Sequence, residues 1–251
     1  MAQAATAELD GGVSTSTNLP ALDETVLATT RYLDALTVLD DESVRSPSVL
    51  PGWTRAHVIT HLCRNADGIA HALRGAQSGA DAWLYTSQES RDADVEAGAG
   101  RTADELREDA AASWGRLGEA VNELHASRFD APVSRLPGDA PFPARNLVVM
   151  RRTEVEVHHA DLDLGYSPAN WPADFSTALI KRRQDELAEL PDGGPSMVLS
   201  STDVEGLWKF GQGAGPEIHG TAGELAWWLV GRAGTNLTCS TGELPVLGRW
   251  R

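Results

Sequence analysis

Cysteine is nearly absent from the chain, which contains only Cys63 and Cys239 among its 251 residues. The two lie far apart in the sequence, and neither is part of a CxxC motif. This excludes a disulfide framework, a thiolate zinc site and a dithiol redox motif. If the protein uses thiol chemistry, we therefore expect the thiol to come from another molecule.

Basic residues and long apolar runs are also scarce. The chain has 36 acidic and 21 basic residues, for a net charge of −15. Such a surface repels phosphate backbones and anionic lipids, so we expect neither a nucleic acid nor a membrane partner. Residues 1–18 lack the basic and apolar regions of a secretory signal and are rich in small residues, which predicts a disordered lead-in. We expect a cytoplasmic monomer.

The first two thirds of the chain have the apolar spacing of helices. The pattern predicts four of them, at residues 22–40, 54–75, 102–125 and 145–164. Thr54 is a suitable N-cap for the second, and Thr102 with Glu105 forms a capping box for the third. The Gly-, Ser- and Asp-rich stretch 76–100 predicts a long loop. Four helices with long connections indicate a four-helix bundle over residues 19–167.

The composition changes after Gly165. A short helix is predicted around residues 173–189, followed by strands in MVLSST and GLWKFG and then the segment PEIHG. A second capping box, Thr221 with Glu224, starts a helix through TAGELAWWLVGR, and the tail offers a last strand. Residues 168–251 are therefore predicted to form a small α+β domain.

Two histidine-containing segments carry candidate metal ligands. In the second helix His57 and His61 are four residues apart, a spacing that places both side chains on one face. The apolar stripe of this helix has His61 at its edge, whereas His57 lies further toward the polar side. His61 is therefore the better candidate ligand, and His57 is predicted to be a solvated flanking residue.

The fourth helix places Glu154, His158 and Asp161 on its apolar strip, and its opposite, polar face collects Arg152, Glu156, His159 and Asp163. A carboxylate on an apolar strip needs a cation or a dense hydrogen-bond network. One divalent metal bound by His61, Glu154 and His158 meets that need. Zinc fits two histidines and a carboxylate, and iron fits them too. Asp161 is placed to orient a ligating histidine. The alternative is a buried Glu–His pair without metal, and His159 is predicted to be solvated.

Three segments, PGWTRAHVITHL, EVEVHHADLDLGY and ELAWWLVGR, resemble the mycothiol-dependent maleylpyruvate isomerase family. That family joins a DinB-like metal-binding helical bundle to a small α+β domain. The resemblance implies zinc ligands at His61, Glu154 and His158, and substrate-binding arginines at Arg232 and Arg91. The simpler alternatives are a helix-terminal cation for Arg232 and a surface ion pair with Glu89 or Asp92 for Arg91.

The resemblance also implies an activity, the cis-to-trans isomerisation of maleylpyruvate to fumarylpyruvate with mycothiol as thiol cosubstrate. A thiolate adds to the double bond, the resulting single bond rotates, and elimination returns the thiol. Zinc keeps the thiol ionised, and arginines bind the carboxylates and the enolate. Two alternatives stay open: a mycothiol S-transferase, which consumes its thiol, and a non-enzymatic zinc-binding regulator. Such regulators tend to carry HxxxCxxC, and Cys63 stands without that pattern.

Overall fold

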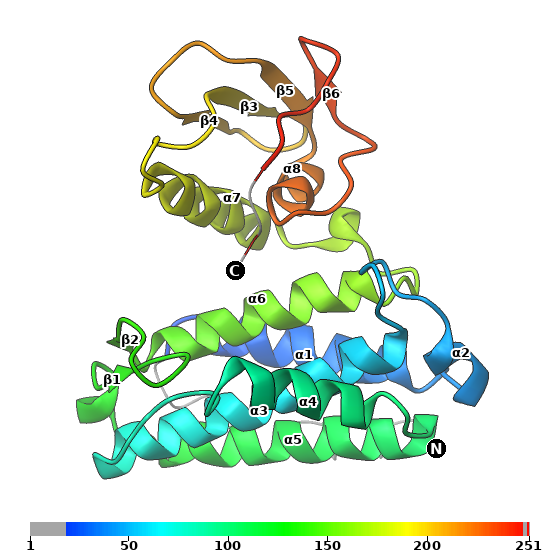
Figure 1. Cartoon of the computed structure of the whole chain (residues 1–251), viewed down its shortest axis with the longest axis vertical. Coiled ribbons are helices and arrows are strands. Elements are labelled where there is room, and N and C mark those ends of the chain that lie inside the picture. The colour runs from blue at the N-terminus through cyan, green and yellow to red at the C-terminus, as the bar shows by residue number, and fades with distance from the viewer. Residues whose placement is uncertain (1–18, 248–249, 251) are drawn as a thin grey trace. The chain divides into compact units, whose positions relative to one another are not determined.

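The computed structural model describes residues 19–247 and Trp250, so the disordered lead-in predicted at residues 1–18 lies outside the described residues. The chain divides into two compact units between Leu164 and Gly165 (Figure 1). The first is helical and the second combines helices with a sheet, which confirms the predicted fold class.

The first unit is a bundle of four long helices: α1 (Leu22–Leu36), α3 (Arg55–Ser78), α5 (Ala103–Glu123) and α6 (Asn146–Asp161). Helix α3 packs against α5 and α6, and α1 packs against α6. Their apolar stripes form one core of mainly Leu, Ile, Val and Ala side chains. Smaller elements join it, among them α2 (Asp41–Arg45), the 3-10 turn η1 (Ala126–Arg128) and a hairpin of β1 (Pro132–Val133) with β2 (Phe142–Pro143).

The prediction of a long loop over residues 76–100 was wrong. Helix α3 continues to Ser78, and a further helix, α4 (Gln88–Gly98), follows. Of the eleven residues of α4, only Val95 and Gly98 are buried, so its sequence carries no apolar stripe to reveal it. One sequence feature does indicate the start of this helix, namely Ser87 as its N-cap residue. The Ser87 side chain accepts a hydrogen bond from the backbone N–H of Ser90 at 3.1 Å.

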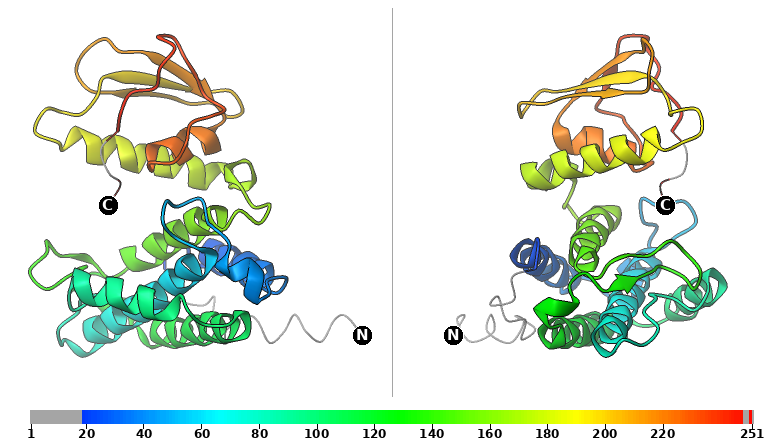
Figure 2. Two further views of the ribbon diagram at one scale, coloured as in Figure 1. Left: turned by 45° about the vertical axis from the view of Figure 1, so that its right-hand side comes forward. Right: turned by 90° about the vertical axis from the view of Figure 1, so that its left-hand side faces the viewer.

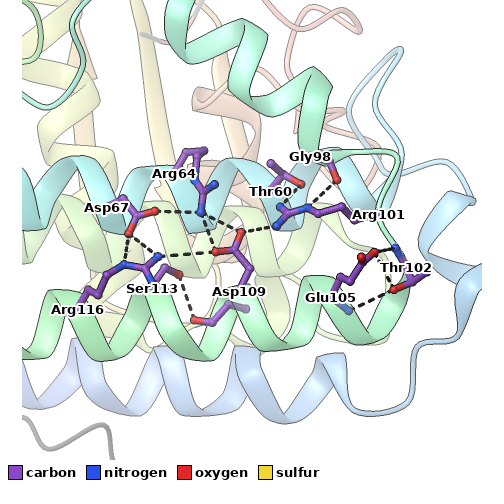
Figure 3. Close-up of polar contacts among 11 residues, drawn as sticks. Thr60, Arg64, Asp67, Gly98, Arg101, Thr102, Glu105, Asp109, Ser113 and Arg116 are labelled. Carbon is purple, nitrogen blue, oxygen red and sulfur yellow. Dashed lines mark hydrogen bonds and ion pairs between the residues drawn. The ribbon is translucent and has the colours of Figure 1, made fainter.

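A network of charged side chains holds the end of α4 against α3 and α5 (Figure 3). Asp109 accepts hydrogen bonds from Arg64 and Arg101, each at 2.7 Å. Arg101 also donates to the Gly98 carbonyl at 3.1 Å and to Thr60 Oγ1 at 3.3 Å. A Cβ atom on Gly98 would lie 2.3 Å from Thr60 Cγ2, so only glycine allows this close approach. Helix α4 is thereby fixed beside the part of α3 that contains His61.

The second unit has a four-stranded sheet with two helices on one of its faces (Figure 2). The strands are ordered β4-β3-β5-β6, where β3 (Met197–Ser201) and β5 (Glu217–Gly220) are parallel. The edge strands β4 (Leu207–Phe210) and β6 (Thr238–Cys239) run antiparallel to their neighbours. The remaining elements are η2 (Pro168–Asn170), α7 (Ala173–Ala188) and α8 (Ala222–Leu229). Within the residues that the structure describes, no helix has the length and apolar character needed to cross a membrane.

Candidate functional site

Helices α3 and α6 bring the three predicted ligands together. One donor atom from each of His61, Glu154 and His158 lies within 4.8 Å of the others. His61 Nε2 is 2.8 Å from Glu154 Oε2, and His158 Nε2 is 3.4 Å from the same oxygen. Both imidazoles are buried, whereas the Glu154 side chain is 26% exposed. The cluster is therefore accessible from the side of its carboxylate.

Asp161 fixes the orientation of the His158 ring. Its carboxylate is fully buried and lies 2.8 Å from His158 Nδ1, one helical turn further along α6. This contact places the ring proton on Nδ1 and directs Nε2 toward Glu154. A carboxylate behind the imidazole is the usual support of a metal-ligating histidine.

The three groups strongly influence one another's ionisation. Burial acts to raise the pKa of the Glu154 carboxyl, but hydrogen bonds from His158 and His61 outweigh it and hold this pKa well below its ordinary value. Burial lowers the pKa of His61 to about 4. For His158 burial acts in the same direction, but the contacts with Asp161 and Glu154 outweigh it and raise its pKa. The carboxylate is thus ionised at neutral pH, as a metal ligand must be.

The donor set fits one divalent metal. Two imidazole nitrogens and a carboxylate oxygen are the protein ligands of many catalytic zinc sites, which keep a further position open for a water or substrate. Iron accepts the same donors. The wholly buried Asp161 behind His158 supports this interpretation, because a buried carboxylate is costly unless it orients or neutralises another group.

Arg91, which the sequence assigned to a loop, lies on α4 and reaches this cluster. Its Nη2 donates a hydrogen bond to His61 Nδ1 at 2.9 Å, and its Nη1 pairs with Asp92 at 2.7 Å. Its guanidinium also lies over the ring of Trp53, 5.9 Å from the centroid. The ion pair considered as an alternative is therefore present, and the same side chain contacts a candidate ligand.

His57 and His159 were both predicted to be solvated flanking residues, and they differ in their burial. His57 is outside the cluster and half-buried, where its Nδ1 accepts a hydrogen bond from the Thr54 N–H at 3.1 Å and caps α3. The prediction for His159 was wrong, since this residue is 3% exposed and meets the Tyr32 ring edge to face. Helix α1 covers the polar face of α6, which also buries Glu156.

Arg232 belongs to the second unit, just after α8. Its guanidinium lies 5.5 Å from the ring centroid of Trp227 and 5.4 Å from that of Trp250. Its Nη1 donates to the Val230 carbonyl at 2.7 Å. These contacts hold the side chain at the helix C-terminus, where a cation is also favoured by the helix dipole.

A cation that was not predicted from the sequence lies behind the cluster. Arg151 is 2% exposed and donates to the Leu62 carbonyl and to Asn65 Oδ1, each at 2.8 Å. It precedes Glu154 by three residues, a spacing that places both on one face of α6. The spacing of Arg151 and Glu154 was the available signal in the sequence. An arginine on the same face as a carboxylate favours the ionised form of that carboxylate.

A buried His–Glu–His cluster within a helical bundle is an arrangement in which metal-binding enzymes hold their metal. Comparisons with known proteins show to which family the chain belongs. The family model "Mycothiol maleylpyruvate isomerase N-terminal domain" matches residues 26–163, more than half of the chain. The chain belongs to this family, and the predicted family membership and enzyme class are confirmed.

Solved structures extend the similarity over both units. The crystal structure of the mycothiol-dependent maleylpyruvate isomerase has 26% sequence identity and a TM-score of 0.86. The structure of a histidine-to-alanine mutant of that enzyme has 25% identity and a TM-score of 0.85. Each match covers 94% of this chain and 100% of the solved chain. No curated protein matches the chain significantly.

Proposed function

We propose that the protein is a zinc- and mycothiol-dependent isomerase that converts maleylpyruvate to fumarylpyruvate. The observation that carries the proposal is the His61, Glu154 and His158 cluster inside the domain that matches the isomerase family. The solved isomerase is similar over 94% of this chain, which supports the same assignment for both units.

His61, Glu154 and His158 would hold the metal, which when bound acts as a Lewis acid that keeps the cosubstrate thiol ionised at neutral pH. Arg91 supplies a planar cation beside this cluster and would bind a substrate carboxylate or the enolate oxygen that develops when the thiolate adds. Arg232 is the second proposed substrate arginine, by resemblance to the family. Trp53 packs against Arg91 and His61 and limits the water around them.

The cysteines of the chain are poor candidates for the attacking thiolate. Cys63 is buried in the bundle core, where burial raises the pKa of its thiol to about 12. Cys239 belongs to the edge strand β6 of the second unit, and its Sγ donates to the Glu243 carbonyl at 3.0 Å. Both observations favour a thiol supplied by the cosubstrate.

The test is turnover of maleylpyruvate by the purified, zinc-loaded protein, with and without mycothiol. We expect fumarylpyruvate to form only when the thiol is present, and the concentration of thiol to stay constant. Turnover that needs no thiol, or no isomerisation at all, would overturn the proposal. A steady consumption of thiol would instead indicate the S-transferase, and a zinc-loaded protein that turns over neither substrate class would indicate the regulator.

A further inference from the structure

The turn before α3 connects the two helices that carry the candidate ligands. In this turn the Trp53 carbonyl accepts hydrogen bonds from the N–H and the hydroxyl of Ser48, at 2.9 and 2.8 Å. The Trp53 N–H donates to the Leu50 carbonyl at 3.1 Å. The Val49 N–H donates at 2.9 Å to the carbonyl of Asp161, the last residue of α6. Trp53 therefore has a backbone position that is fixed relative to both α3 and α6.

The half-buried indole ring of Trp53 lies against two histidines of α3. Its centroid is 5.8 Å from that of the His61 ring, with the planes at 59°, and 6.0 Å from that of the His57 ring, which it stacks at 25°. The His57 ring is itself held in place. Its Nδ1 accepts a hydrogen bond from the Thr54 N–H at 3.1 Å, and its Nε2 is 3.5 Å from Oε2 of Glu96 on α4. These contacts give the indole ring a defined orientation beside the cluster.

Arg91 reaches the same ring from α4. Its Cζ lies 5.9 Å from the indole centroid of Trp53, which is within the range of a cation–π contact. The Arg91 side chain is only 14% exposed, and its Nε is buried and has no hydrogen-bond partner among the residues that the structure describes. A guanidinium that is largely withdrawn from water needs compensation for its lost hydration. The face of the indole ring supplies part of that compensation.

The ion pair between Arg91 and Asp92 does not by itself direct the guanidinium to the cluster. The Asp92 side chain is 55% exposed, so solvent screens this pair and weakens it. Because the two residues are adjacent in the sequence, the pair could also form with the guanidinium turned away from His61. The contact with Trp53 is compatible only with a guanidinium that lies beside the α3 histidines, since the indole ring is packed against them.

We propose that Trp53 is a positioning residue of this site, whose indole ring holds the Arg91 guanidinium beside His61 and so presents this cation to an anionic ligand of the cluster. Trp53 acts through Arg91 and makes no ligand contact of its own. That the anionic ligand is the substrate rests on the proposed function, whereas the position of the guanidinium rests on the contacts among Trp53, Arg91 and His61.

The first experiment observes Arg91 directly by NMR of the zinc-loaded protein. Because the Arg91 Nε–H is buried, its proton should exchange slowly with solvent and give a resonance that is missing in Arg91→Met. In Trp53→Leu this exchange should be roughly 10-fold faster, since the guanidinium is no longer held. Trp53→Met is a second non-aromatic variant in case Trp53→Leu does not fold. Trp53→Phe keeps an aromatic face and should keep slow exchange. Leu50→Ala is the matched control, because it removes packing of the same turn against the core and leaves the indole ring in place.

The second experiment measures turnover of maleylpyruvate by the same zinc-loaded variants. Trp53→Leu should lower kcat/KM by roughly 10-fold, and Trp53→Phe should restore most of this loss. In the Arg91→Met background, Trp53→Leu should lower kcat/KM little further, because both changes act through one guanidinium. Zinc content should stay at the value of the unmodified protein, since no candidate ligand changes.

The outcomes separate this proposal from the proposed function. Absence of isomerase activity in the unmodified protein would overturn the function, while the exchange rate of the Arg91 Nε–H would still decide the role of Trp53. That role would be overturned by equal exchange rates in Trp53→Leu and the unmodified protein, or by the lack of a slowly exchanging Arg91 resonance in the unmodified protein. Equally fast exchange in Leu50→Ala, or additive losses of kcat/KM in the double variant, would also overturn it, because a general loosening of the turn would then explain the effect of Trp53→Leu.

Discussion

The Arg91 guanidinium donates a hydrogen bond to Nδ1 of His61 at 2.9 Å, so a permanent cation touches a candidate metal ligand. The usual partner at this position is an acceptor, as Asp161 is for His158 at 2.8 Å. A cation near a divalent metal repels it and attracts anions. The position of Arg91 therefore favours an anionic ligand at the cost of some metal affinity.

This relationship predicts opposite effects on metal binding and on turnover. Arg91→Met should raise the zinc affinity, by roughly tenfold, because it removes a like charge from beside the site. The same variant should lower kcat/KM by about 100-fold, since a charged donor is lost. Arg91→Lys retains the positive charge, so its zinc affinity should stay as weak as that of the unmodified protein. Chelator competition and steady-state kinetics measure both effects, and an unchanged zinc affinity in Arg91→Met would contradict the electrostatic argument.

The ligand set predicts about one divalent metal per chain, bound by His61, Glu154 and His158. His61→Ala and His158→Ala should each abolish stoichiometric zinc binding, because only two protein ligands remain. His71→Ala is the matched control, since this histidine is exposed on the same helix as His61. Elemental analysis of the dialysed proteins gives the stoichiometry. Full zinc occupancy in His61→Ala would refute the assignment.

The charged network below α4 predicts that Asp109 stabilises the bundle more than a typical surface carboxylate. Its side chain is 14% exposed and pairs with Arg64 and Arg101. Asp109→Ala leaves these cations without their shared partner and should lower the free energy of unfolding by about 2 kcal/mol. Asp104→Ala, on the same helix but 83% exposed, should cost less than 1 kcal/mol. Urea unfolding of both variants measures these losses in the free energy of unfolding. A loss in Asp109→Ala no larger than that in Asp104→Ala would contradict the prediction.

The cluster of His61, Glu154 and His158 could be predicted from the sequence because each helix carried its own evidence. Glu154 and His158 are four residues apart on an apolar strip, where an ionised carboxylate needs compensation. The surroundings of the cluster could not be predicted in the same way. Whether the polar face of α6 is solvated depends on α1, whose packing buries Glu156 and His159. A helical wheel contains no information about such a neighbour.

Two further features depend on close approach between segments that are separate in the sequence. Helix α4 has no apolar stripe and is held by Gly98 and the Arg101 contacts, so its periodicity gave no signal for Arg91. The contact of Tyr85 with α3 requires Gly68, which looks like an ordinary helical glycine until the packed structure is known. In both places a missing side chain allows another segment to lie close to α3.

Burial of His159 predicts a loss of stability in mild acid. Burial lowers its folded-state pKa to about 4, below the value of about 6.5 in an unfolded chain. Between these two values the unfolded state binds more protons, so stability falls as the pH drops from about 6.5 to 4 and levels off below that. His159→Gln removes this contribution. Urea unfolding at pH 7 and pH 5 should therefore show a smaller acid-induced loss in the variant than in the unmodified protein, and equal losses would contradict the prediction.

The last prediction concerns Arg232, whose guanidinium lies against Trp227 and Trp250 within the second unit. If it only stabilises the end of α8, Arg232→Ala should lower the Tm slightly and leave kinetics unchanged. If it binds the substrate, as we propose, the loss of one charged donor should lower turnover by about 100-fold or more. Arg232→Lys should restore only part of it, because an ammonium lacks the bidentate fork. Zinc content should be unaffected, since no candidate ligand changes. Turnover at saturating thiol, measured with zinc content and Tm for both variants, decides between the two roles. Near-normal turnover in a folded, zinc-loaded Arg232→Ala protein would leave Arg232 a purely structural residue.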